Sequence, residues 1–210
     1  MDGSKRTFFS DYGGFDISSR NHTLGDCSFV GKNIFDERVL SDIEEYISRQ
    51  QLVDAQCGTG NSYKNKNDQS ITRSTKIHWM RSQDKCLVPI YHEISTKIRL
   101  INHNMWDYTY DGYEPFQYSE YDISDHFDWH IDQIKFTGPN IRKVSFSIGL
   151  SNEDEYEGGD LVLKQSDKDN HYKLGRGDII VFPSWMLHKV TPITKGKRRV
   201  VVGWAQGSII

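Results

Sequence analysis

Four side chains that bind metals or transfer protons alternate along one short segment of the chain. His126, Asp128, His130 and Asp132 occupy every second position. On a β-strand these four would share one face, and the residues between them would share the other, because the side-chain period of a strand is two. A face of two imidazoles and two carboxylates is costly to bury without a ligand. The segment therefore predicts either a metal site or a strand face in contact with water.

A His-x-Asp pair places an imidazole and a carboxylate about 7 Å apart at their Cα atoms, so both can lean onto one ion. Two such pairs overlap here, His126-x-Asp128 and His130-x-Asp132, and spacing alone does not choose between them. A third ligand is available in His188, which ends an apolar segment. Two histidines and one carboxylate form the facial triad typical of non-haem iron, which leaves coordination positions open for reactants.

A lone arginine opens the last apolar strand expected in the chain. Arg198, Val200 and Val202 would share one face of that strand, and Arg199 would face the opposite way. A cation on an apolar face needs an anionic partner, and a planar guanidinium suits a carboxylate held by two parallel hydrogen bonds. The alternative is a surface arginine in a basic turn.

The order of these motifs resembles the prolyl 4-hydroxylase-like branch of the Fe(II)/2-oxoglutarate dioxygenases over residues 70–207. The matching residues, in chain order, are Tyr121, His130, Asp132, Arg142-Lys143-Val144-Ser145, Glu157-Gly158-Gly159-Asp160, Gly177-Asp178, Phe182-Pro183-Ser184, His188-Lys189-Val190-Thr191-Pro192 and Gly196-Lys197-Arg198. The resemblance also separates the overlapping pairs, because the family pattern places aromatic-Asp-aromatic directly before the ligand histidine, as Phe127-Asp128-Trp129 does here.

The resemblance implies that His130, Asp132 and His188 bind Fe(II), and that Arg198 with Tyr121 binds the distal carboxylate of 2-oxoglutarate. It implies hydroxylation of a C–H bond with dioxygen, release of succinate and carbon dioxide, and support by ascorbate (vitamin C). A peptide or protein substrate of the prolyl type is the first expectation. A small-molecule hydroxylase of the same class and a non-catalytic jelly-roll binding module are the alternatives.

Departures from the family pattern limit what is carried over. Ser124 stands where the family usually has glycine, and Arg198 stands where collagen-type members carry lysine, which weakens any claim of a collagen-like substrate. Repair demethylases that act on nucleobases carry a second arginine six positions after the first, and here that position is Trp204. Gly158 and Gly159 are expected to form a tight turn, and Arg142 to serve strand packing.

The elements around these residues predict an α+β fold that is mostly β. Apolar periodicity indicates helices over 36–51 and 84–103 and a strand over 75–80, and from Phe116 onward short apolar segments alternate with glycine and proline turns. We expect a single domain, 1–210. It divides into N-terminal helical and strand support over 1–115 and a double-stranded β-helix, or jelly roll, over 116–208. Residues 56–70 are polar enough to form a lid-like loop.

Composition excludes several partner classes. Lys plus Arg total 26 against 29 Asp plus Glu, a net charge of −3, so no overall field attracts nucleic acid or an anionic membrane. No apolar stretch approaches the roughly 20 residues of a spanning helix. Three scattered cysteines predict neither disulfides nor a cysteine zinc site, and no targeting segment is recognisable. We expect a cytoplasmic monomer.

Overall fold

The computed structural model describes residues 27–55, 73–133 and 140–208, so the expected loop over 56–70 lies outside the described residues. The helices are α1 (Glu37–Ser48), the short 3-10 helix η1 (Lys85–Leu87) and α2 (Val88–Met105). The strands are β1 (Phe29–Gly31), β2 (Val53–Asp54), β3 (Arg73–Ser74), β4 (Lys76–Met80), β5 (Gly112–Tyr113), β6 (Phe116–Tyr121), β7 (His126–His130), β8 (Asn140–Gly149), β9 (Tyr156–Gly158), β10 (Leu161–Gln165), β11 (Lys168–Tyr172), β12 (Ile179–Pro183), β13 (His188–Val190), β14 (Ile193–Gly196) and β15 (Arg198–Ser208).

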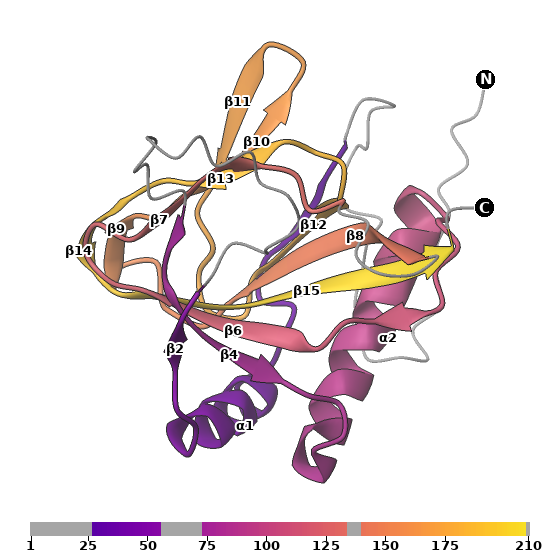
Figure 1. Ribbon diagram of the computed structural model, residues 1–210, viewed down its shortest axis with the longest axis horizontal. Helices are drawn as coiled ribbons and strands as arrows, with labels where there is room; N and C mark the ends of the chain where they lie inside the picture. Colours follow the sequence, from indigo (N-terminus) through magenta and orange to yellow (C-terminus); the bar gives the residue numbers. More distant parts are fainter. Residues whose placement is uncertain (1–26, 56–72, 134–139, 209–210) are drawn as a thin grey trace, which may run out of the picture.

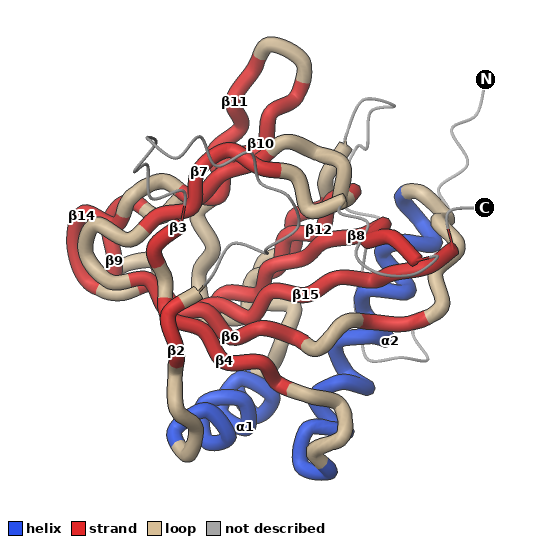
Figure 2. The backbone as a smooth tube through the Cα atoms, viewed as in Figure 1, coloured by secondary structure: helices blue, strands red, loops and turns tan. Residues whose placement is uncertain are grey.

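The strands form two main antiparallel sheets. Within the described ranges, the larger sheet has the order β1-β12-β8-β15-β6-β4-β2, with β5 paired to β15, and the smaller has the order β11-β10-β13-β7-β3. A two-stranded sheet of β14 and β9 lies apart from both in hydrogen bonding. Figures 1 and 2 show both helices on the side of the larger sheet that faces away from β7, β10 and β13. The chain is therefore layered as helices, large sheet and small sheet.

Both predicted helices form, and their boundaries follow from local chemistry. Helix α1 begins after Asp36, whose carboxylate accepts a hydrogen bond from the backbone N–H of Val39 at 3.1 Å. Its buried residues recur at helical spacing, namely Val39, Leu40, Ile43 and Ile47. Helix α2 carries proline in its first turn, where a missing N–H has no cost. The apolar stripe of each helix packs against the large sheet.

The large sheet is buried on both faces, and its side chains alternate between two cores. On β12, Ile179 and Val181 pack with the helices, whereas Ile180 and Phe182 pack in a second cluster with residues of the smaller sheet. On β6 the same alternation sends Tyr121 into the second cluster. One face of each long strand in the large sheet therefore points into the space between the two sheets. The other face packs against the apolar residues of the helices.

The predicted glycine turn is confirmed in its backbone geometry. Gly158 and Gly159 have φ angles of 74° and 66°, in the left-handed region that residues with a Cβ rarely adopt. A Cβ on Gly159 would also lie 2.9 Å from the Cδ atom of Arg198. This turn therefore lets the chain pass close to the arginine that opens β15.

The expectation of a mostly β chain is confirmed. From Phe116 onward every described element is a strand, and the pairings in the two main sheets are antiparallel. Among the described residues, no helix combines the length and the apolar character needed to cross a membrane.

The contact between α2 and the large sheet predicts a stability difference between two isoleucines. Ile98 of α2 is fully buried, so Ile98→Ala should lower the free energy of unfolding by about 2–5 kcal/mol through lost burial and a cavity. Ile123, 63% exposed, is the matched control, and Ile123→Ala should change it by less than about 0.5 kcal/mol. Urea denaturation measures both. Equal losses in the two variants would contradict this packing.

Candidate metal centre and adjoining cavity

A β-bulge in β7 decides which side chains of the histidine-rich segment face inward. His188 of β13 pairs with His130, but Val190, two residues on, pairs with Phe127, three residues back, so β7 carries one extra residue. The rings of Phe127 and His130 stack with centroids 3.5 Å apart, on the same side. The prediction that 126–132 alternates strictly is therefore wrong: the bulge shifts the alternation, and Asp128 is exposed.

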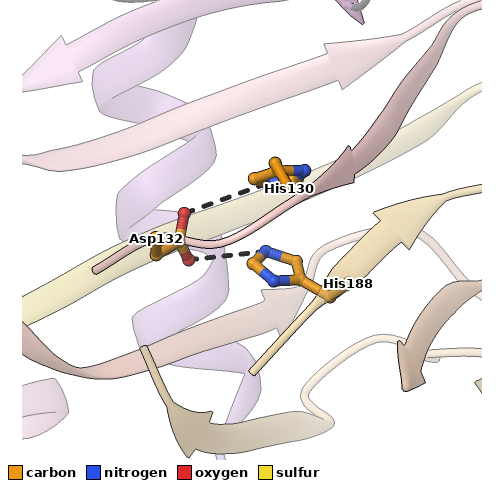
Figure 3. A group of neighbouring side chains, drawn as sticks. All are labelled: His130, Asp132 and His188. Atoms are coloured by element: carbon orange, nitrogen blue, oxygen red, sulfur yellow. Dashed lines mark ion pairs between the residues drawn. The ribbon is translucent and has the colours of Figure 1, made fainter. Parts of the chain in front are cut away.

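The bulge brings His130 together with Asp132 and His188 (Figure 3). Their potential ligand atoms all lie within 4.8 Å of one another. The Oδ1 atom of Asp132 is 3.9 Å from Nε2 of His130, and its Oδ2 atom is 3.4 Å from Nε2 of His188. Among the described residues this is the one cluster of three or more His, Cys, Asp or Glu side chains that could hold a metal, and it does not include His126 or Asp128.

Both imidazoles are oriented by backbone carbonyl groups. Nδ1 of His130 lies 2.6 Å from the carbonyl oxygen of Asp128, and Nδ1 of His188 lies 2.9 Å from that of Met186. A carbonyl oxygen only accepts hydrogen bonds, so each Nδ1 must carry the proton. Each Nε2 then presents a lone pair toward Asp132, which is the tautomer that a metal ligand requires.

Asp132 is held in place by neighbours on four strands, β7, β8, β13 and β15, and by Ser184. Its backbone N–H donates to the carbonyl oxygen of Ser184 at 3.0 Å, and its Oδ2 accepts from the Ser145 hydroxyl at 2.8 Å. Burial opposes its ionisation, but His188, His130 and Arg142, with a hydrogen bond from Trp204, together hold the pKa of Asp132 below its ordinary value. Burial, assisted by His188, lowers the pKa of His130 to about 4. At neutral pH the cluster is one carboxylate and a neutral His130.

A cavity that is partly open to solvent adjoins the cluster between the two sheets. Its walls combine the three clustered side chains with polar and aromatic residues of both sheets. The lining residues include Arg73, Gln117, Tyr121, Phe127, Ser145 and Trp204. The cavity therefore offers space next to the three donor atoms, bounded by side chains that can hold a polar molecule.

Arg198 and Tyr121 are brought together, as their motif predicts. They are register partners on β15 and β6, and the guanidinium carbon of Arg198 lies 5.3 Å from the centre of the Tyr121 ring. Tyr121 lines the cavity, and Arg198 is 2% exposed and lies outside the lining set. The Tyr156 hydroxyl is a hydrogen-bond partner of Arg198. Among the described residues, however, Nε of Arg198 has no hydrogen-bond partner and its guanidinium no ion pair.

Comparison with known proteins identifies a family that this site resembles. Residues 116–206 match the sequence model of the 2OG-Fe(II) oxygenase superfamily, which covers the whole cluster and Arg198. Similar proteins and structures also confirm the predicted resemblance to the prolyl 4-hydroxylase-like branch of these oxygenases.

Two curated relatives of this chain are PKHD-type hydroxylases. The one from Idiomarina loihiensis is 35% identical over 91 residues, which cover 43% of this chain and 41% of the relative. The one from Crocosphaera subtropica is 27% identical over 179 residues, which cover 84% of this chain and 77% of the relative. In the Idiomarina loihiensis relative and in two further PKHD-type hydroxylases, the matched stretch is about two fifths of the relative's length.

Two solved structures share the fold of this chain at low sequence identity. A Pseudomonas putida prolyl-4-hydroxylase has a TM-score of 0.67 at 16% identity, over 86% of this chain and 92% of that protein. The viral collagen prolyl hydroxylase of Paramecium Bursaria Chlorella virus-1 has a TM-score of 0.64 at 14% identity, over 87% and 97%. These likenesses establish the architecture that surrounds the cavity.

The oxygenase family implies Fe(II) and 2-oxoglutarate, and the residues present fit both. Two imidazole Nε2 atoms and one carboxylate form the donor set that non-haem iron prefers. The unpartnered Nε of buried Arg198 is the orphaned polar group that a carboxylate of 2-oxoglutarate could satisfy.

The sequence does not indicate that several side chains contact Asp132. Arg142 was expected to serve packing, but its Nη1 lies 3.9 Å from Oδ1 of Asp132 while its Nε and Nη2 bind Glu114. Ser145 was quoted only as part of a motif, and Trp204 only to disfavour nucleobase repair. Their partnership with Asp132 depends on pairing between distant strands, so the only signal in the sequence is the Arg-Lys-Val-Ser motif itself.

The depressed pKa of His130 predicts how the metal-free protein responds to acid. The unfolded chain protonates this imidazole below about pH 6.5, whereas the folded protein resists protonation until about pH 4. Stability should therefore fall as pH drops from 6.5 toward 4, by roughly 2 kcal/mol at pH 5 from this group. Denaturant titrations of the protein in chelator, compared with His130→Gln, measure the difference. Parallel pH profiles for the two proteins would contradict the assignment.

Proposed function

We propose that the chain is an Fe(II)- and 2-oxoglutarate-dependent dioxygenase that hydroxylates a C–H bond of a peptide or protein in the manner of prolyl hydroxylases. His130, Asp132 and His188 are the proposed iron ligands, and Arg198 with Tyr121 the proposed binding residues for the distal carboxylate of 2-oxoglutarate. The observation that carries the proposal is the convergence of the three donor atoms within 4.8 Å at the edge of the cavity. The double-stranded β-helix of 116–208 is the proposed catalytic core.

The protein's own residues have three tasks in this reaction. When bound, Fe(II) with 2-oxoglutarate and dioxygen supplies the oxidising power, so that one oxygen atom enters the substrate and the other leaves in succinate as carbon dioxide is released. The backbone carbonyl groups of Asp128 and Met186 keep the two imidazoles in the ligand tautomer. Ser145 and Trp204 fix the carboxylate of Asp132. The walls between the sheets limit water and orient the substrate.

The substrate class is supported by similarity. The curated relatives are named PKHD-type hydroxylases, and one structural neighbour is a prolyl hydroxylase in complex with a peptide of hypoxia inducible factor. All five proposed binding residues come from one chain, so a monomer suffices. Ascorbate support and a cytoplasmic location stay predictions.

Loss of a triad side chain should remove metal binding and turnover together. In His130→Ala, Asp132→Asn and His188→Ala we expect succinate formation from 2-oxoglutarate, with Fe(II), ascorbate and air, to fall to background. Calorimetric Fe(II) affinity under anaerobic conditions should fall at least tenfold. His92→Ala, at an exposed position of α2, is the control. If the wild type neither forms succinate nor binds Fe(II) or 2-oxoglutarate, the non-catalytic binding module is the better account.

Arg198 should control the affinity for 2-oxoglutarate. Arg198→Met removes a charge-assisted pair from a buried position, so the concentration of 2-oxoglutarate at half-maximal succinate formation should rise at least tenfold. Arg199→Met is the matched control, because Arg199 bonds Glu155 and the Ser151 hydroxyl instead. The same half-saturating concentration in wild type and Arg198→Met would disprove the role of Arg198.

A further inference from the structure

A second arginine, Arg73 of β3, lines the cavity beside the candidate metal centre. Its Nη2 donates to Oε1 of Gln117 at 2.7 Å, and its guanidinium carbon lies 4.7 Å from the centre of the Phe127 ring. Its Nε is buried and has no hydrogen-bond partner among the described residues. A guanidinium group is thus held in place by a neutral amide and an aromatic ring, with one buried donor unsatisfied.

The charge environment of Arg73 points to an anionic ligand. In the described part of the chain no Asp or Glu forms an ion pair with it, and its fixed partner Gln117 is neutral and 1% exposed. The neighbouring Asp125 is engaged by the Ser74 hydroxyl and by the backbone N–H of Asp122. Arg142 shows the contrast, because its Nε and Nη2 bind both carboxylate oxygens of Glu114. An unpaired cation at a cavity wall favours an anionic ligand.

Arg73 and Arg198 approach the space between the sheets from opposite sides. Arg73 belongs to the small sheet, next to Phe127 on β7, and Arg198 belongs to the large sheet, next to Tyr121 on β6. Arg73 is also close enough to His130 to contribute to its electrostatic environment. In the proposed function, the two carboxylates of 2-oxoglutarate are accounted for by the metal and by Arg198. The partner of Arg73 must then be a third anionic group.

We propose that Arg73 binds a carboxylate of the primary substrate, so that the hydroxylated molecule carries an acidic group next to the reacting carbon. This inference rests on the proposed function and narrows its substrate class. The carboxylate belongs either to an acidic side chain adjacent to the target residue or to the terminal carboxyl group of that residue. A planar guanidinium with a free Nε–H suits either source, since both present two oxygens in one plane.

The test compares acids with their amides. The protein is loaded with Zn(II), which is redox-inert, and 2-oxoglutarate, and dissociation constants are measured by saturation-transfer NMR. N-acetyl-aspartyl-prolinamide against N-acetyl-asparaginyl-prolinamide reports on a side-chain carboxylate. N-acetyl-proline against N-acetyl-prolinamide reports on a terminal one. We expect at least one acid to bind at least tenfold more tightly than its amide, and Arg73→Gln to abolish that preference.

Two controls separate the possible failures. Arg38→Gln, on the exposed side of α1, removes the same charge far from β3 and should keep the acid preference. The half-saturating 2-oxoglutarate concentration for succinate formation without substrate should be the same in Arg73→Gln and wild type. A rise like that expected for Arg198→Met would assign Arg73 to the co-substrate and overturn the inference. The inference would also be overturned if acids and amides bound equally well, if neither bound, or if the acid preference survived in Arg73→Gln. Wild-type protein that neither forms succinate nor binds 2-oxoglutarate would instead overturn the proposed function.

Discussion

The ionised carboxylate of Asp132 is buried between two sheets, and burial of a charge is costly unless other groups compensate for it. The compensation comes from a hydroxyl on β8, an indole on β15 and the nearby Arg142. Both sheets must therefore be in register before this charge can be accommodated. The two Nε2 lone pairs and the carboxylate face one another, an arrangement that a cation between the three donor atoms would stabilise.

The bulge in β7 is the local feature on which that geometry depends. A regular strand would place Phe127 and His130 on opposite faces, and either the aromatic wall of the cavity or the imidazole would be lost. One extra residue between Phe127 and His130, relative to their partners on β13, puts both rings inside, stacked on each other, and leaves Asp128 in contact with water. The Asp128 backbone stays in use, because its carbonyl fixes the His130 tautomer. Bulges are common next to functional sites for this reason: they re-aim side chains.

The sequence predicted what depends on local pattern and missed what depends on long-range pairing. Apolar periodicity located α1 and α2 to within a few residues. The glycine pair Gly158-Gly159 predicted the turn beside Arg198, where both residues have positive φ. The motif order indicated which His-x-Asp pair joins His188. Strict alternation failed at the bulge, because a bulge arises from pairing between β7 and β13. The sequence also did not indicate a role for Arg73, because its place at the cavity follows from the pairing of β3 with β7.

The large sheet has an apolar core with the helices on its outer side, which explains why polar side chains can occupy the space between the two sheets. Helices α1 and α2 and the outward-facing residues of β12 and β15 form a continuous apolar core on one side of the large sheet. That core stabilises the sheet from one side. On the inner face, Gln117, Ser145 and Ser147 line the cavity beside the apolar side chains of the second cluster. The small sheet then serves to bring groups to the cavity: His130, His188 and Arg73 all come from its strands. Since a guanidinium left unpaired between sheets costs stability, its place there is best explained by a ligand that compensates for it.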